Sequence, residues 1–131
     1  MAADTSLQPA RDHLDWPFYG EEHRALAVAA DAFIAGKGLG AIDHHDADAA
    51  CRALVAKLGA AGFLRHCVPQ AYGGVSPAID SRSLCVMRET LAYADGLADF
   101  AFAMQGLGTG AISLSGTDSV KQAVLPKVAK G

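Results

Sequence analysis

Imidazole and carboxylate side chains, the groups that bind zinc and related metals, stand together at residues 43–46, Asp-His-His-Asp. Adjacent side chains point apart, and no second cluster with matching spacing completes a set of ligands. We therefore interpret this stretch as a polar loop. Asp46 or Asp48 is expected to cap the helix that follows it, because a carboxylate accepts hydrogen bonds from free backbone N–H groups.

A second candidate is His66 beside Cys67, a pair that would suggest an activated thiol. The following Val68-Pro69 favours an extended chain, in which neighbouring side chains point to opposite sides. We therefore expect neither residue to activate the other. Glu89 is expected to be the most buried acid, satisfied by an ion pair or a hydrogen bond.

Motifs that hold phosphate groups or build a nucleophile are absent from the sequence. It contains no Gly-x-Gly-x-x-Gly, no Gly-x-x-x-x-Gly-Lys-Ser/Thr and no Gly-x-Ser-x-Gly. The sequence therefore predicts no catalytic residue and no metal site within these 131 residues.

Apolar residues recur at helical spacing in five stretches, and no run alternates with the period of a strand. The helices are expected at residues 21–35, about 47–61, about 81–95, 97–115 and from a cap at Thr117 to the end. Their predicted inward faces are Leu26, Ala30, Phe33 and Ile34; Cys51, Leu54, Val55 and Leu58; Leu84, Met87, Leu91 and Ala94; and Val120, Ala123 and Val124. Asp80 or Ser81 is expected to cap the third helix.

The connection between the second and third helices carries its own signals. Gly62 is placed to close a helix in the left-handed conformation. Val68-Pro69 must be extended, because proline excludes the helical conformation from the residue before it. Gly73-Gly74 predicts a turn after this extended crossing.

The first 14 residues are polar and aperiodic, which predicts a flexible arm, and residues 15–131 are expected to form one domain. Trp16, Phe18 and Tyr19 follow the arm beside a proline. We expect these rings to be buried and to pin the arm against the helices, with ligand stacking as the alternative.

The fourth predicted helix contains Gly106, Gly108 and Gly110. Each interior glycine costs of the order of 1 kcal/mol relative to alanine. Two readings explain their presence: another helix packs closely against this backbone, or a ligand chain lies against it.

Composition narrows the class of protein. Hydrophobic residues make up 51% of the chain and the net charge is -3, which excludes disorder and disfavours nucleic acid or an anionic membrane as the main partner. The three cysteines are widely spaced, so we expect reduced thiols and a cytoplasmic location. No stretch reaches the roughly 18 apolar residues of a membrane span.

Three segments together resemble one family. Residues 58–74, LGAAGFLRHCVPQAYGG, resemble the signature of the acyl-CoA dehydrogenase N-terminal domain. Residues 116–131, GTDSVKQAVLPKVAKG, and residues 88–92, RETLA, resemble two further motifs of the family in the same order. The resemblance covers residues 15–131.

The resemblance implies an all-α, up-and-down bundle of about five helices, followed in the whole enzyme by a β-domain and a second helical bundle. FAD would bind mainly to those later domains, and the catalytic glutamate would also lie there. The whole enzyme would dehydrogenate an acyl-CoA substrate at the α and β carbons. Its other implied partners are the remaining domains of the enzyme, further copies in a homo-oligomer and an electron-transfer protein.

The resemblance also implies that the fourth helix forms one wall of the acyl pocket. Carried over by position, the substrate-binding residues are Asp99, Phe100, Ala103, Met104 and Leu107. The bulky Phe100 and Met104 would shorten a straight-chain pocket or favour a branched or cyclic acyl group. We expect an exposed apolar patch around this helix and the turn at residues 72–74.

Two alternatives remain open. One is a flavin monooxygenase or desulfurisation enzyme built on the same three domains. The other is a non-catalytic helical interaction module.

Overall fold

The computed structural model describes residues 9–131, and this part of the chain is all-α without a strand. Five α-helices form it: α1 (Glu21–Ala35), α2 (Ala47–Ala60), α3 (Ser81–Ala94), α4 (Gly96–Ser115) and α5 (Asp118–Lys130). Three short 3-10 helices accompany them: η1 (Asp12–Asp15), η2 (Phe63–Cys67) and η3 (Gln70–Tyr72). The prediction of five helices and no strand is confirmed for these residues.

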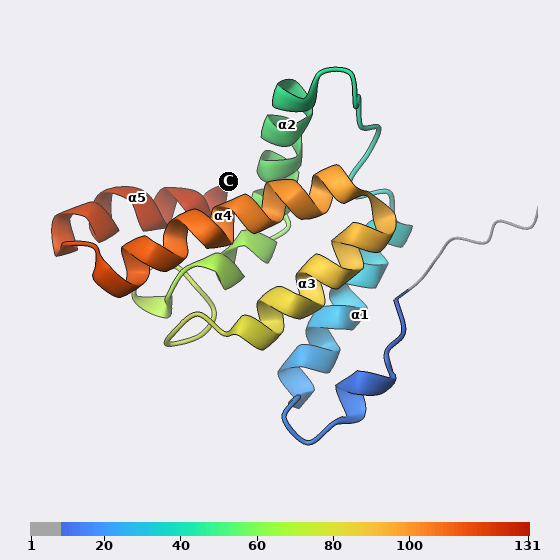
Figure 1. Cartoon of the computed structure of the whole chain (residues 1–131), viewed down its shortest axis with the longest axis horizontal. Helices are drawn as coiled ribbons and strands as arrows, with labels where there is room; N and C mark the ends of the chain where they lie inside the picture. Colours follow the sequence, from blue (N-terminus) through green and yellow to red (C-terminus); the bar gives the residue numbers. More distant parts are fainter. Residues whose placement is uncertain (1–8) are drawn as a thin grey trace, which may run out of the picture.

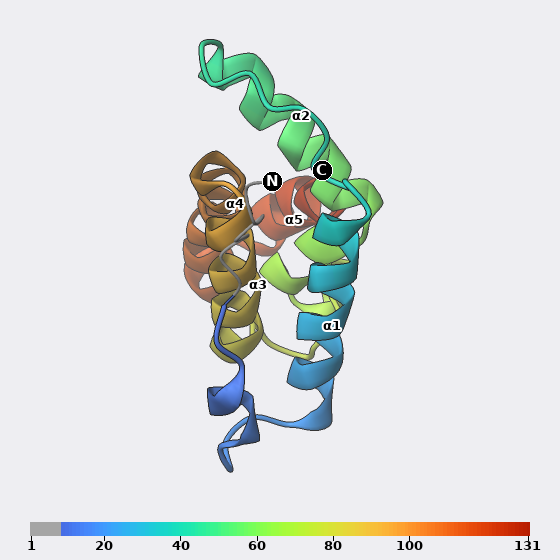
Figure 2. The ribbon, with the colours of Figure 1, turned by 90° about the vertical axis from the view of Figure 1, so that its right-hand side faces the viewer.

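The helices do not all pack against their neighbours in sequence. α1 lies beside α3, and α3 packs on α4 (Figure 1). α2 and α5 both pack against α4, and η2 lies between these elements. In both views the first turns of α2 extend away from the other helices (Figure 2).

The helix caps follow the sequence closely. Asp46 accepts a hydrogen bond from Ala49 N at the start of α2, and Asp80 caps α3. Thr117 caps α5 through Val120 N. These side chains satisfy backbone N–H groups that lack a partner inside the helix.

The core is built mainly from α1 to α4 and η2. Its fully buried large side chains include Leu54, Leu58, Leu64, Met87, Leu91 and Phe102. A second, smaller cluster forms around Val68, Leu125 and Ala129.

Two of the predicted inward faces are partly wrong. Ala94 at the end of α3 is exposed, and in α5 Val120 and Ala123 are also exposed. α5 instead buries Leu125 and Ala129, because it packs on η2 and η3 along this face. The helix continues through Pro126, although a proline inside a helix lacks the backbone N–H of one helical hydrogen bond.

The connection from α2 to α3 confirms three expectations and corrects one. Gly62 is left-handed with φ 85°, Val68 and Pro69 are extended, and Gly73 turns the chain with φ 100°. A Cβ at Gly74 would lie 1.8 Å from the carbonyl oxygen of Val68, so only glycine fits there. Residues 63–67, however, form the 3-10 helix η2 rather than an extended segment.

The N-terminal segment is ordered earlier than expected. Of the expected arm, residues 1–8 lie outside the described residues, whereas η1 begins at Asp12 and Leu14 is buried. Trp16 and Phe18, expected to be buried, are each more than half exposed. Leu14 takes their anchoring role, because its aliphatic side chain enters the core while the two rings meet edge to face at the surface. Tyr19, the third ring expected to be buried, is partly buried against the core.

Candidate functional site

One face of α4 is apolar and exposed. Phe100, Met104, Leu107 and Leu114 are 54%, 46%, 69% and 86% exposed, and the small residues Gly108 and Ala111 are exposed between them. Their spacing of three or four residues places them on one side of a helix. The opposite side buries Ala98, Ala101, Phe102 and Thr109. We call the exposed face the α4 surface: Phe100, Met104, Leu107, Gly108, Ala111 and Leu114.

The structure brings three of the five predicted site residues together on this surface. Phe100, Met104 and Leu107 are exposed along it, whereas Asp99 and Ala103 are half-buried at its border. The expected apolar patch is thus present on α4. At the turn of residues 72–74, Tyr72 is half-buried against the Leu125 cluster. The substrate-binding role of the five residues stays a prediction.

Asp99 is not a free carboxylate. Arg88 on α3 donates two hydrogen bonds to it, from Nε to Oδ1 and from Nη2 to Oδ2, each 2.9 Å long. The hydrogen bonds and the charge of Asp99 raise the pKa of Arg88. The pair itself carries no net charge.

The glycines of α4 face open space. A Cβ built at Gly108 or Gly110 meets no atom within 4 Å, and one built at Gly106 meets Cys67 Sγ at an ordinary contact distance of 3.9 Å. Among residues 9–131, therefore, no helix packs closely against the backbone at Gly108 or Gly110. The reading that invokes a second helix of this chain is wrong for these two positions.

Thr109 ties the buried side of α4 to the connection below it. Its hydroxyl donates to the carbonyl oxygen of Cys67 at 2.6 Å, with Gln105 O also within reach at 2.8 Å. This bond fixes α4 on η2 and so orients the opposite, exposed face.

The His66–Cys67 pair does not form an activated thiol. Burial raises the pKa of the Cys67 thiol to about 12, so the thiol stays protonated near neutral pH. Burial, followed by the charge of Arg65, lowers the pKa of His66. Glu89 lies 3.5 Å from Arg11 and 3.3 Å from His13, so the ion pair with Arg11 satisfies it as expected. The expectation that Glu89 is the most buried acid is wrong, because its side chain is 32% exposed whereas that of Asp80, held by His23 and Arg82, is 18% exposed.

The polar residues near position 44 are engaged by the protein itself. His44 Nε2 lies 2.8 Å from Asp95 Oδ2, Asp43 accepts from His45 N, and Asp46 caps α2. In residues 9–131 no group of three or more His, Cys, Asp or Glu side chains is arranged to hold a metal ion.

A cavity of about 870 Å³ lies away from the α4 surface, between the ends of α1 and α3 and the segment that joins α1 to α2. Ile34, Leu39 and Ile42 give it an apolar lining, and Lys37 and Tyr93 also line it.

No described α-helix is long and apolar enough to cross a membrane.

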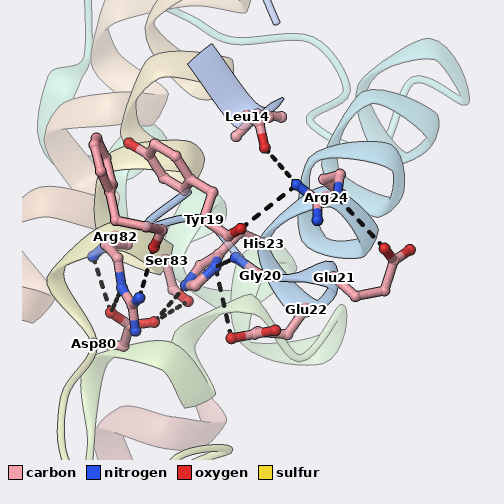
Figure 3. Close-up of polar contacts among 11 residues, drawn as sticks. Leu14, Tyr19, Gly20, Glu21, Glu22, His23, Arg24, Asp80, Arg82 and Ser83 are labelled. Carbon is pink, nitrogen blue, oxygen red and sulfur yellow. Dashed lines mark hydrogen bonds and ion pairs between the residues drawn. The ribbon is translucent and has the colours of Figure 1, made fainter. Parts of the chain in front are cut away.

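The sequence interpretation missed a buried polar network around His23 (Figure 3). His23 is fully buried; Gly20 N donates to its Nδ1 at 2.8 Å, and its Nε2 lies 2.6 Å from Asp80 Oδ2. Because Nδ1 accepts, Nε2 carries the proton and donates to Asp80. Its position three residues after the helix-capping Gly20 was a signal for this role.

Burial alone would raise the pKa of Asp80. The hydrogen bonds from His23 and Arg82, with the charge of Arg82, outweigh burial and lower that pKa to about 2. Arg82 also donates to the carbonyl oxygen of Phe18 at 2.7 Å. The network therefore joins the starts of α1 and α3, and its groups hold one another rather than facing a ligand site.

Comparison with known proteins agrees with the fold. Residues 20–131 match the family model described as "Acyl-CoA dehydrogenase, N-terminal domain". A similar protein is the "Probable acyl-CoA dehydrogenase fadE25" of Mycobacterium leprae (strain TN), 35% identical over 114 residues. The match covers 83% of this chain and 28% of that relative, so the chain spans under a third of the relative's length. On the family match and the five-helix fold, the chain belongs to the acyl-CoA dehydrogenase family through its N-terminal domain.

Proposed function

We propose that this chain is the N-terminal domain of an FAD-dependent acyl-CoA dehydrogenase and that the α4 surface forms one wall of its acyl pocket. The observation that carries the proposal is the exposed apolar face of α4, where Phe100, Met104 and Leu107 line up beside the open space at Gly108. A folded domain rarely leaves four large apolar side chains of one helix exposed without a partner for them.

The chemistry of this surface suits an acyl chain. Burial of each methylene group against an apolar wall is favourable by about 0.8 kcal/mol. Phe100 and Met104 project from the backbone, whereas Gly108 and Ala111 leave it low. On such a surface, Phe100 and Met104 would limit the length of the acyl chain, whereas Gly108 and Ala111 would let the chain approach the helix backbone closely.

The α4 surface does not fit the diphosphate of FAD. α4 contains no lysine or arginine that could neutralise a diphosphate, and the neighbouring Arg88 is held by Asp99. We therefore place the flavin and the catalytic base in parts of the whole enzyme outside this chain. The proposed partners are those remaining domains, an acyl-CoA, further copies of the enzyme and an electron-transfer protein, in the cytoplasm.

Replacement of Phe100 by alanine in the natural gene product tests the wall. We expect the preference among straight-chain acyl-CoA substrates to move toward longer chains, because the ring no longer fills that space. The ratio of kcat/KM for a longer to a shorter substrate should rise about tenfold, the effect of one or two methylene groups in an apolar site. Val28→Ala is the control, since Val28 is 69% exposed on α1.

An unchanged chain-length preference in the Phe100→Ala enzyme would contradict the proposal that the α4 surface forms a wall of the acyl pocket.

The intact mass of the gene product and its visible spectrum test the wider proposal. A bound flavin bleached by acyl-CoA without oxygen supports a dehydrogenase. Turnover that requires oxygen would indicate a monooxygenase relative, and a product of this length without flavin would indicate a non-catalytic module.

A further inference from the structure

The Arg88–Asp99 pair is the polar boundary of the α4 surface. Asp99 is the one charged residue of α4, and its side chain is only 16% exposed, whereas that of Arg88 is 54% exposed. Both carboxylate oxygens accept from the guanidinium, which is the geometry in which arginine holds a carboxylate most firmly. The contact joins the middle of α3 to the first turn of α4.

The Arg88–Asp99 contact and the helix cap restrain α4 in different ways. Asp95 accepts from Leu97 N and Ala98 N, which anchors the beginning of the helix along its axis. Arg88 holds a side chain of the same turn from outside, and this restrains the rotation of the helix about its axis. Phe100 is next to Asp99 in the chain, so its position depends on this restraint.

We propose that Arg88 is a positioning residue that, through Asp99, holds Phe100 in place and sets the longest acyl chain that the α4 surface accepts. The inference rests on the proposed function. An apolar chain that reached the pair would remove water from two charged groups without offering them hydrogen bonds, which is unfavourable. The pair therefore ends the apolar wall as well as holding it.

The test uses the full natural gene product with its flavin. Arg88→Met keeps the approximate length of the side chain but removes the guanidinium group and its two hydrogen bonds to Asp99. We expect the ratio of kcat/KM for longer to shorter straight-chain acyl-CoA substrates to rise about tenfold, mainly through KM for the longer substrate. Arg52→Met is the matched control, because Arg52 contacts Asp48 at 3.9 Å on an exposed part of α2.

Rescue separates positioning from simple loss of stability. Arg88→Lys keeps the positive charge but cannot donate two parallel hydrogen bonds, so its ratio of kcat/KM for longer to shorter substrates should be intermediate. Asp99→Asn should shift this ratio in the same direction as Arg88→Met. If Arg88→Met does not fold, these two variants decide. Wild-type ratios in folded, flavin-bound Arg88→Lys and Asp99→Asn enzymes would overturn the inference.

The outcomes also distinguish a failure of the positioning role of Arg88 from a failure of the proposed function. If Phe100→Ala moves the chain-length preference and the Arg88 variants do not, the wall stands and the positioning role falls. If the wild-type protein binds no flavin or turns over no acyl-CoA, both fall.

Discussion

At the scale of single residues, the His23–Asp80 contact shows how one buried polar pair joins two helices. The two side chains are 57 positions apart in the sequence, and neither faces the α4 surface. Asp80 also accepts from Arg82 N, Arg82 Nε and Ser83 Oγ. A buried imidazole is tolerated here because both ring nitrogens have partners.

The Asp80→Asn variant should lower the free energy of unfolding by about 1–3 kcal/mol at pH 7, because hydrogen bonds to a charged group are replaced by neutral ones. Chemical denaturation followed by circular dichroism measures this change. Asp48→Asn is the control, since Asp48 is exposed in α2 and should change stability by less than about 0.5 kcal/mol.

The same carboxylate predicts a pH dependence. Its pKa is lowered from the ordinary 3.8 to about 2 on folding, so the folded state favours the ionised form. Its contribution, about 1–2 kcal/mol, is complete at pH values well above 3.8, decreases as the pH falls below it, and is lost below about pH 2. The difference in stability between the wild type and Asp80→Asn should therefore shrink over this acid range. A difference independent of pH would contradict the charged role of Asp80.

At the scale of elements, three glycines illustrate different demands of the backbone. Gly62 ends α2 with φ 85° and has open space around its missing Cβ, so only its conformation requires glycine. Gly74 is required by contact with Val68 O. Gly108 lies within α4 with open space and no left-handed backbone, so the fold of this chain does not require glycine there.

Alanine substitutions should separate these cases. Gly62→Ala should destabilise the chain by about 1–2 kcal/mol, because a left-handed residue with a Cβ is strained. Gly108→Ala should stabilise it by about 0.5–1 kcal/mol, since alanine loses less entropy in a helix. Thermal unfolding of the two variants and the wild type shows whether each substitution lowers or raises the stability of the chain. A stability loss in Gly108→Ala would show that the fold itself requires this glycine.

At the scale of the whole molecule, we expect the exposed α4 surface to cause self-association of the 131-residue chain. A double variant, Leu107→Lys with Leu114→Glu, should remain folded because both side chains are exposed, at 69% and 86%. It should sediment as a monomer at concentrations where the wild type associates. Val28→Lys tests an equally exposed apolar residue on α1 and should leave association unchanged. Equal association of all three proteins would show that another surface is responsible.

Sequence alone determined the features that depend on neighbours in the chain. The five helices, the caps at Asp46, Asp80 and Thr117 and the left-handed Gly62 follow from helical periodicity, local hydrogen bonds and backbone sterics. The family motifs likewise led to the correct fold. The exposed face of α4 was predicted from the family resemblance, because a helix that lines a pocket shared with other domains presents an apolar face to them.

Tertiary structure decided which groups meet across the chain. The pairing of Arg88 with Asp99 and of His23 with Asp80 depends on how α1, α3 and α4 pack, which no local pattern specifies. The buried face of α5 and the exposure of Trp16 depend in the same way on which element lies opposite. A side chain's own type sets its tendency to be buried, but the packing of distant elements determines whether a partner is there to bury it.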